Sequence, residues 1–157
     1  HRNTRRQRQM CIRDSARARQ WLGHPYPFSG RVVRGEQLGR KLGFPTANLE
    51  SEEPLKRLPG RGVYAVWARI VGTGDWQPAM VNIGIRPTVQ DDGITENMEV
   101  HLLEGGRQCY DETMELQFMA RLRDEMMFEG LKALQDQLQQ DAQKARSILE
   151  TEPVPVP

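Results

Sequence analysis

The chain has 157 residues, a formal net charge of +1, 38% hydrophobic residues and 27% charged residues. This length favours one domain, which can bury enough apolar surface to fold without cross-links. No apolar run approaches the roughly 18 residues that a membrane span needs, and no apolar stretch follows the N-terminal arginines as in a secretory signal. Cys11 and Cys109 provide neither a disulfide framework nor a zinc spacing. We therefore expect a cytoplasmic globular protein with no membrane partner.

The charge is unevenly distributed. Residues 1–20 contain seven arginines and one aspartate, whereas the rest of the chain has a net charge of −5. An arginine-rich arm can bind nucleic acid, but residues 1–15 lack apolar periodicity and turn signals. We interpret them as a disordered or non-native extension, and residues 16–25 as a connecting segment that ends at a glycine and a proline.

Strand-type segments follow in chain order. β-Branched, aromatic or alternating residues predict strands at residues 31–34, 47–49, 63–71, 79–83, 98–103 and 113–121. The last segment alternates strictly, with one face formed by Met114, Leu116, Phe118 and Ala120 and the other by Glu115, Gln117, Met119 and Arg121. Strands at this spacing, with no helix between them, predict an antiparallel barrel or sandwich.

The C-terminal part has a helical period. Apolar residues recur at steps of three and four, at Phe128, Leu131, Leu134, Leu138, Ala142, Ala145 and Leu149. This stripe predicts one amphipathic helix that packs on the barrel. Proline alternates with valine at the end of the chain, so residues 151–157 are expected to form a Pro-rich tail that cannot continue the helix.

Residues 34–48 (RGEQLGRKLGFPTAN) are the stretch best suited to ligand binding. Its glycines, Gly35, Gly39 and Gly43, allow the backbone to approach a ligand closely. Arg40 and Lys41 supply cations for an anionic group. The chain contains no Walker A motif, so the loop is not that of a P-loop enzyme.

The Pro-Thr-Ala-Asn element at residues 45–48 sharpens this prediction. Period-two geometry places the Thr46 hydroxyl and the Asn48 amide on one face. Two neutral oxygen ligands suit Mg²⁺, which also takes oxygens from a nucleotide. On its own, the tetrapeptide is equally consistent with an ordinary turn.

Together and in this order, five segments resemble the riboflavin kinase family. They are GRVVRGEQLGRKLGFPTANL (30–49), GRGVYAV (60–66), VNIGIRPT (81–88), MEVHLL (98–103) and RLRDEMMFEGLKAL (121–134). The likeness covers residues 26–149 and is greatest to the C-terminal kinase module of bacterial bifunctional riboflavin kinase/FMN adenylyltransferases. It implies a six-stranded antiparallel Greek-key barrel over residues 26–150 with a long C-terminal helix. It also implies transfer of the ATP γ-phosphate to the 5′-hydroxyl of riboflavin, giving FMN for FMN and FAD biosynthesis.

The resemblance also implies roles for particular residues. It gives Thr46 and Asn48 the task of holding Mg²⁺ and the ATP phosphates, and makes Glu99 the catalytic residue. The loop that covers the nucleotide would include Gly35, Arg40, Lys41, Gly43 and Pro45. A flap over the flavin would include Arg123, Glu125 and Phe128, with Asn82 and Thr88 near the site.

The chemistry agrees with a role for Glu99. A primary alcohol attacking phosphorus must lose its proton, and a positioned carboxylate that accepts it contributes about 10²- to 10⁴-fold. Without the resemblance, a carboxylate on a strand would more often face water. His101 lies on the same face two residues further on, where we expect a solvated or hydrogen-bonded histidine, because no second His or Cys is near.

The sequence departs from the family in two places. Asp111 stands where the family usually has a glycine, and aspartate is among the residues that tolerate positive φ. The adenylyltransferase domain expected before the kinase module has no counterpart in this sequence. We therefore expect FMN and not FAD as the product, with that domain as the covalent neighbour in a full-length parent.

Two other classes of function stay open at this point. A non-catalytic flavin- or nucleotide-binding barrel would need damage at Thr46, Asn48 or Glu99, and all three residues are present. A barrel that binds nucleic acid through the arginine-rich head should show aromatic residues interleaved with cations on one sheet face. The negative charge of the body and its scattered tryptophans argue against that partner.

Overall fold

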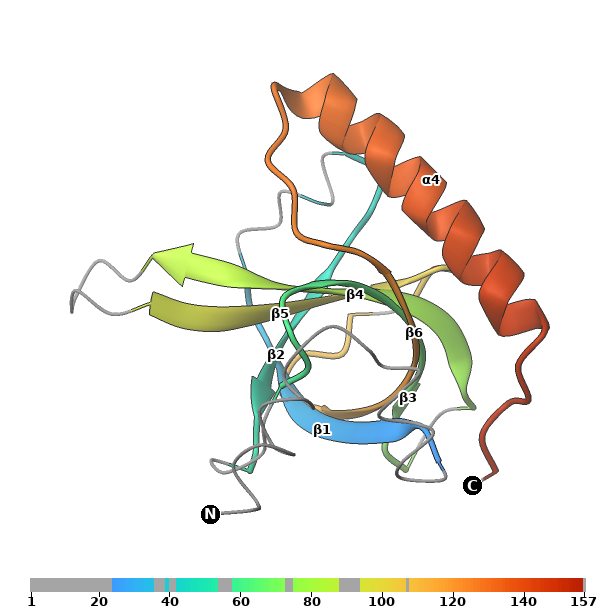
Figure 1. The fold of residues 1–157 in the computed structure, drawn as a ribbon. Coiled ribbons are helices and arrows are strands. Elements are labelled where there is room, and N and C mark those ends of the chain that lie inside the picture. Colours follow the sequence, from blue (N-terminus) through green and yellow to red (C-terminus); the bar gives the residue numbers. More distant parts are fainter. Residues whose placement is uncertain are drawn as a thin grey trace, which may run out of the picture.

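The computed structural model describes residues 24–35, 39, 42–53, 58–72, 75–87, 94–106 and 108–156. Within these ranges the chain forms six strands and one helix (Figure 1): β1 (Tyr26–Val33), β2 (Ala47–Ser51), β3 (Gly62–Ile70), β4 (Gln77–Pro87), β5 (Ile94–Leu102), β6 (Thr113–Arg123) and α4 (Leu131–Glu150). The predicted N-terminal extension, Arg40, Lys41 and Thr88 lie outside the described residues.

The strands close into an antiparallel barrel in the order β1-β2-β5-β4-β3-β6. Every neighbouring pair is antiparallel. The helix runs diagonally along the outside of the barrel (Figure 1) and contacts β3, β4 and β6. The predicted fold, a six-stranded antiparallel barrel with a long C-terminal helix, is confirmed.

Two apolar clusters hold this arrangement together. The barrel interior contains side chains such as Phe28, Tyr64 and Phe118. A second cluster joins the outer face of β3, β4 and β6 to Ala142, Ala145 and Leu149 of the helix. Full burial of one large aliphatic side chain is worth about 1.5–3 kcal/mol. Because β3 contributes to both clusters, it is buried on both faces, which explains its nearly continuous apolar sequence.

The helix begins later than the apolar stripe predicts. Gly130 precedes it with φ of 139°, which is not a helical conformation, so the helix begins only at Leu131. Phe128 therefore lies outside the helix and lines a cavity instead, so its predicted place in the helical stripe is wrong. Leu131, in the first turn, is 60% exposed.

The strict alternation predicted for β6 is confirmed only in its first half. Met114, Leu116 and Phe118 point into the barrel. Two register shifts against β3 then leave Met119 and Leu122 without a partner residue, and both pack in the outer cluster. Extra residues of this kind re-aim the side chains that follow. Ala120 consequently pairs with Ala65 of the outer cluster, so its predicted face was wrong.

The turn before β6 has positive φ at Asp111, the position where the family usually has a glycine. Asp111 has φ of 65°, and no other non-glycine residue in the described ranges has positive φ. Its N–H donates to the carbonyl oxygen of Val32 at 2.9 Å, so the turn is tied to β1.

Substitutions of Asp111 should therefore differ in their effect on stability according to how well the new residue tolerates positive φ. Asp111→Val is expected to lower the free energy of unfolding by about 1–2 kcal/mol, because a β-branched residue is strained at positive φ. Asp111→Gly is expected to change it by less than about 1 kcal/mol. Urea denaturation of both variants tests this, and equal midpoints for the two would contradict it.

Candidate active site

A row of side chains crosses neighbouring strands on the outer face of the barrel. Asn48 of β2 lies opposite Glu99 of β5, which lies opposite Asn82 of β4. Asn82 lies opposite Val63 of β3, and Val63 lies opposite Arg123 at the end of β6. Residues directly opposite one another share a face of the sheet. The barrel register therefore gathers these side chains from distant parts of the sequence.

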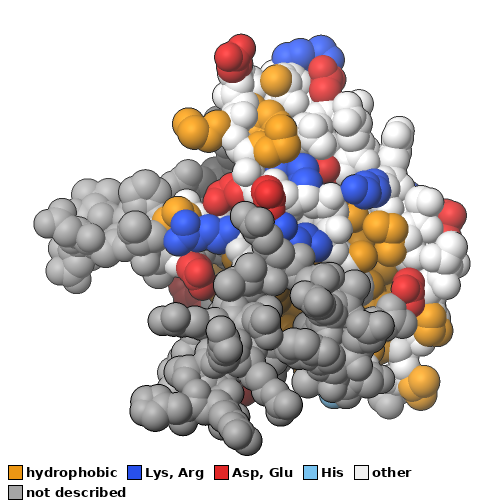
Figure 2. All heavy atoms as spheres, viewed as in Figure 1, with side chains coloured by type: hydrophobic (Ala, Val, Ile, Leu, Met, Phe, Trp, Pro, Cys, Tyr) orange, Lys and Arg blue, Asp and Glu red, His pale blue; other side chains and the backbone are white. Residues whose placement is uncertain are grey.

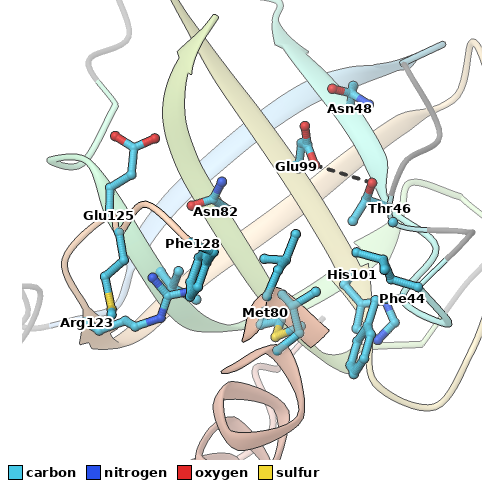
Figure 3. Close-up of a pocket in the computed structure, with 16 residues that line it drawn as sticks. Phe44, Thr46, Asn48, Met80, Asn82, Glu99, His101, Arg123, Glu125 and Phe128 are labelled. Atoms are coloured by element: carbon cyan, nitrogen blue, oxygen red, sulfur yellow. Dashed lines mark hydrogen bonds between the residues drawn. The ribbon is translucent and has the colours of Figure 1, made fainter. Parts of the chain in front are cut away.

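A cavity of about 290 Å³ lies over this row. The loop before β2 lines one end with Gly39, Leu42, Phe44 and Thr46, and the connection from β6 to the helix lines the other with Glu125, Met126 and Phe128. Leu134 and Leu138 of α4 also line it. Figure 3 shows the side chains converging, with Thr46 and Asn48 on one side of Glu99 and Asn82 on the other.

Contacts at both of its oxygens hold the Glu99 carboxylate. One oxygen accepts a hydrogen bond from the Thr46 hydroxyl at 3.4 Å, drawn as the dashed line in Figure 3. The other accepts from the amide of Asn97 at 2.8 Å. Among the described residues, both contacts are to neutral donors. The carboxylate is thus held in the row between Asn48 and Asn82.

Two glycines in the loop before β2 are required by close packing against the predicted ligand-binding residues. A Cβ at Gly35 would lie 1.8 Å from the Asn48 amide nitrogen. A Cβ at Gly39 would lie 2.2 Å from the Phe44 carbonyl oxygen and 3.3 Å from the Thr46 hydroxyl. These glycines therefore let the loop lie against Thr46 and Asn48. Gly43 instead has φ of 81°, and no atom of the described residues would lie within 4 Å of a Cβ there.

The oxygens at this end of the cavity fit a hard cation. Thr46 and Asn48 supply neutral oxygens and Glu99 a carboxylate, all lining one cavity. In the described part of the chain, no group of three or more His, Cys, Asp and Glu residues could hold a metal by itself. A cation here would therefore complete its coordination with oxygens from water or from a ligand.

His101 anchors the element that carries Thr46. Its Nδ1–H donates to the Pro45 carbonyl oxygen at 2.8 Å, and its ring lies 5.1 Å from that of Phe44. The histidine is hydrogen-bonded, as expected. Burial, followed by the charge of Arg146, lowers the pKa of His101 below its usual 6.5, against the opposing effect of the Pro45 hydrogen bond.

This shift predicts a loss of stability in acid. The unfolded chain takes up the proton at about pH 6.5, whereas the folded chain resists it until the pH falls further. The free energy of unfolding should therefore fall as the pH drops below about 6.5. His101→Gln should remove that part of the decline in urea denaturation between pH 7.5 and 5.5. The same pH dependence in the variant and the parent would contradict this cause.

Arg123 is held from the helix side. Its Nε–H donates to the Asp141 carboxylate at 2.9 Å, and Nη2 lies 2.8 Å from the same group. The guanidinium also lies 5.6 Å from the centre of the Phe128 ring. The connection that carries Glu125 passes close over β4, where a Cβ at Gly84 would meet the Glu125 carboxylate at 2.5 Å.

The structure thus brings most of the predicted site residues around one cavity: Thr46, Asn48, Asn82, Glu99, Arg123, Glu125 and Phe128. Pro45 lies on the other side of Thr46 and lines a second cavity, of about 90 Å³, with Cys109 and Tyr110. Sequence reasoning missed Asp141, which is 3% exposed. Asp141 falls three residues after Leu138 on the buried face of the helix. A carboxylate at such an apolar position could have indicated a buried cationic partner.

Apolar side chains are also exposed to solvent beside this cavity. Met126, Met127 and Leu131 are 50%, 99% and 60% exposed. Figure 2 shows apolar side chains at the surface near the connection that leads into the helix. Met127 points away from the cavity into solvent, whereas Met126 also lines the cavity.

The fold and the site define a class of protein: a small barrel with a cavity in its side wall. Side-chain oxygens line one end of the cavity, an arginine and an aromatic ring line the other, and a carboxylate lies between them. Comparison with known proteins is more specific. A family model described as riboflavin kinase matches residues 22–149. The chain belongs to the riboflavin kinase family.

Two of the following three similar proteins are themselves named as riboflavin kinases. The chain is 42% identical over 136 residues to the bifunctional riboflavin kinase/FMN adenylyltransferase of Escherichia coli K12, covering 85% of this chain and 41% of that protein. It resembles a crystal structure named as a macrolide-efflux protein from Streptococcus pneumoniae, with a TM-score of 0.81 and 32% identity, over 91% of this chain and 45% of the other. Riboflavin kinase from Trypanosoma brucei matches with a TM-score of 0.55 and 25% identity, over 83% of each chain.

The chain spans about two fifths of the length of the curated relatives it matches, as the 41% coverage of the Escherichia coli protein illustrates. No helix in the described part of the chain has the length and apolar character needed to span a bilayer.

Proposed function

We propose that this domain transfers the γ-phosphate of ATP to the 5′-hydroxyl of riboflavin, giving FMN and ADP, with Glu99 as the general base. The observation that carries the proposal is the position of the Glu99 carboxylate between two chemically different ends of one cavity. Thr46 and Asn48 lie on one side of it, and Asn82, Arg123 and Phe128 on the other. Membership of the riboflavin kinase family supports the same assignment.

The polar end suits the nucleotide. Thr46 and Asn48 would bind a divalent cation together with phosphate oxygens, and the adjoining glycines leave the loop backbone room to lie close to them. When bound, the cation offsets the negative charge that the transferring phosphoryl oxygens carry. The loop cations predicted from the sequence, Arg40 and Lys41, would act on the same charge.

The other end suits a flavin. Phe128 offers an aromatic face, Val63 and Leu138 are apolar, and Asn82 and Arg123 supply hydrogen-bond donors. With the ring held there and its ribityl chain directed along the row, the terminal hydroxyl would reach Glu99. The carboxylate would accept the hydroxyl proton as the oxygen–phosphorus bond forms and the bond to ADP breaks.

A direct assay tests the activity. The purified chain is incubated with ATP, Mg²⁺ and riboflavin, and FMN and FAD are separated by chromatography. We expect FMN in amounts equal to the ADP released, and no FAD. Absence of FMN would refute the proposal and favour a flavin- or nucleotide-binding barrel without catalysis, although Thr46, Asn48 and Glu99 all line the cavity.

Thr46→Val tests the metal end separately. The substitution is nearly isosteric and removes only the hydroxyl. It should raise the Mg²⁺ concentration needed for half-maximal activity by about tenfold, a loss of about 1.4 kcal/mol, with little effect on riboflavin affinity. Titration of Mg²⁺ at fixed ATP measures this, and an identical metal requirement in variant and parent would mean that Thr46 is a turn residue.

A further inference from the structure

The carboxylate of Asp141 is deeply buried between α4 and the end of β6, on the outside of the barrel. Its side chain is 4% exposed and that of its partner Arg123 is 16% exposed. The Arg123 Nε–H donates to both carboxylate oxygens, at 2.9 and 3.1 Å, and Nη2 lies 2.8 Å from one of them. Gln137, one helical turn earlier, donates to Asp141 at 3.0 Å. Both carboxylate oxygens therefore accept hydrogen bonds.

Stability alone is a weak reason for this arrangement. Burying an ion pair costs solvation of both charges, and apolar residues of similar size often serve a core equally well. Asp141 occupies a position on the buried face of a helix whose other buried residues are Ala142, Ala145 and Leu149. An ion pair at that position points to a task for the orientation of Arg123.

The contacts that Arg123 makes with the described part of the chain leave part of its guanidinium free for a ligand. Of the five guanidinium N–H groups, Nε–H is used by Asp141, one on Nη2 faces the same carboxylate, and one on Nη1 donates to the Asp124 carbonyl oxygen at 3.0 Å. One N–H on each terminal nitrogen has no partner among the described residues. Arg123 lines the cavity beside Phe128, over whose ring its guanidinium lies.

We propose that Asp141 is a positioning residue for the flavin end of the site. It fixes the guanidinium plane of Arg123, so that two N–H donors remain for a carbonyl or hydroxyl oxygen of the substrate. It also neutralises the cation, so that this end recognises an uncharged polar ring by hydrogen bonds and not by charge. The inference rests on the proposed riboflavin kinase function.

Lys144 provides a matched control on the same helix. Its ammonium donates to the Leu122 carbonyl oxygen at 2.9 Å, so it also ties α4 to the end of β6, one residue before Arg123. Lys144→Met removes that tie without touching Arg123 or the cavity. Asp141→Asn keeps the shape of the side chain but removes its charge and one of its two acceptor oxygens.

The test compares the parent, Asp141→Asn and Lys144→Met. Riboflavin affinity is measured by quenching of flavin fluorescence, and kcat and the KM values for riboflavin and ATP by FMN formation. Asp141→Asn should weaken riboflavin binding and raise its KM by about tenfold, the equivalent of 1.4 kcal/mol, with the ATP KM within about twofold of the parent. Lys144→Met should lower the melting temperature and leave riboflavin affinity unchanged.

A merely structural role predicts a different result. If Asp141→Asn and Lys144→Met weaken riboflavin equally, or if folded Asp141→Asn binds riboflavin like the parent, the proposal is wrong. Should Asp141→Asn fail to fold, Asp141→Glu keeps the charge but displaces the carboxylate by one methylene. It should still weaken riboflavin several-fold, and parental affinity in that variant would overturn the proposal. A parent that neither binds riboflavin nor forms FMN would refute the proposed function itself.

Discussion

Glu99→Gln should lower kcat for FMN formation by about two orders of magnitude or more, with little change in riboflavin affinity. The amide keeps the shape of the side chain and can still meet Thr46, whose hydroxyl now lies 3.4 Å from the carboxylate. It cannot accept the proton of the ribityl hydroxyl. The step that depends on proton transfer is therefore slowed, while the contacts that bind the two substrates remain.

The control for this prediction is Glu96→Gln. Glu96 lies on the same strand, opposite Ile85, and does not line the cavity. Its substitution changes the net charge by the same amount and should leave kcat unchanged. Steady-state kinetics of the two variants at saturating ATP and Mg²⁺ measure the difference. A kcat for Glu99→Gln within about threefold of the parent would exclude Glu99 as a general base, since such bases contribute far more.

Local sequence patterns predicted some strands well and others only in part: the strand predicted at residues 31–34 misses residues 26–30 of β1, although Phe28 belongs to the core. β3 and the first half of β6 have the expected apolar pattern. The ends of β4 and β5 were missed, because their ladder continues through pairs such as Gly84–Asn97 and Ile85–Glu96. Backbone hydrogen bonds extend a hairpin without apolar side chains, so the alternation that predicts a strand is weak there.

Prediction of the site residues required information of a different kind. The Pro-Thr-Ala-Asn element is contiguous, and its chemistry could be inferred from the residues. The row from Asn48 through Glu99 to Asn82 depends on the register of three strands, which no local pattern specifies. The resemblance to riboflavin kinases supplied those residues. The pairing of Arg123 with Asp141 depends on how α4 docks, and it was not predicted from the sequence.

Substrate binding at the two ends of the cavity should be coupled. The loop before β2, the connection after β6, and Leu134 and Leu138 of the helix all line the same cavity. The Gln135 amide also donates to the Leu42 carbonyl oxygen at 3.3 Å, which joins the helix to the loop. If both segments close over their ligands in one shared state, each ligand should tighten the other by about 1–3 kcal/mol, or about 5- to 150-fold.

Calorimetric titration of riboflavin with and without Mg²⁺-ADP measures this coupling. We expect tighter flavin binding in the presence of the nucleotide, and a smaller difference in Gln135→Leu, which loses the bond to the loop. Arg123→Ala is a poor probe, because it leaves the Asp141 charge buried without a counter-charge, at a cost of about 3–5 kcal/mol in stability. Equal riboflavin affinity in the two titrations of the parent would mean that the two ends of the cavity close independently, even in an active kinase.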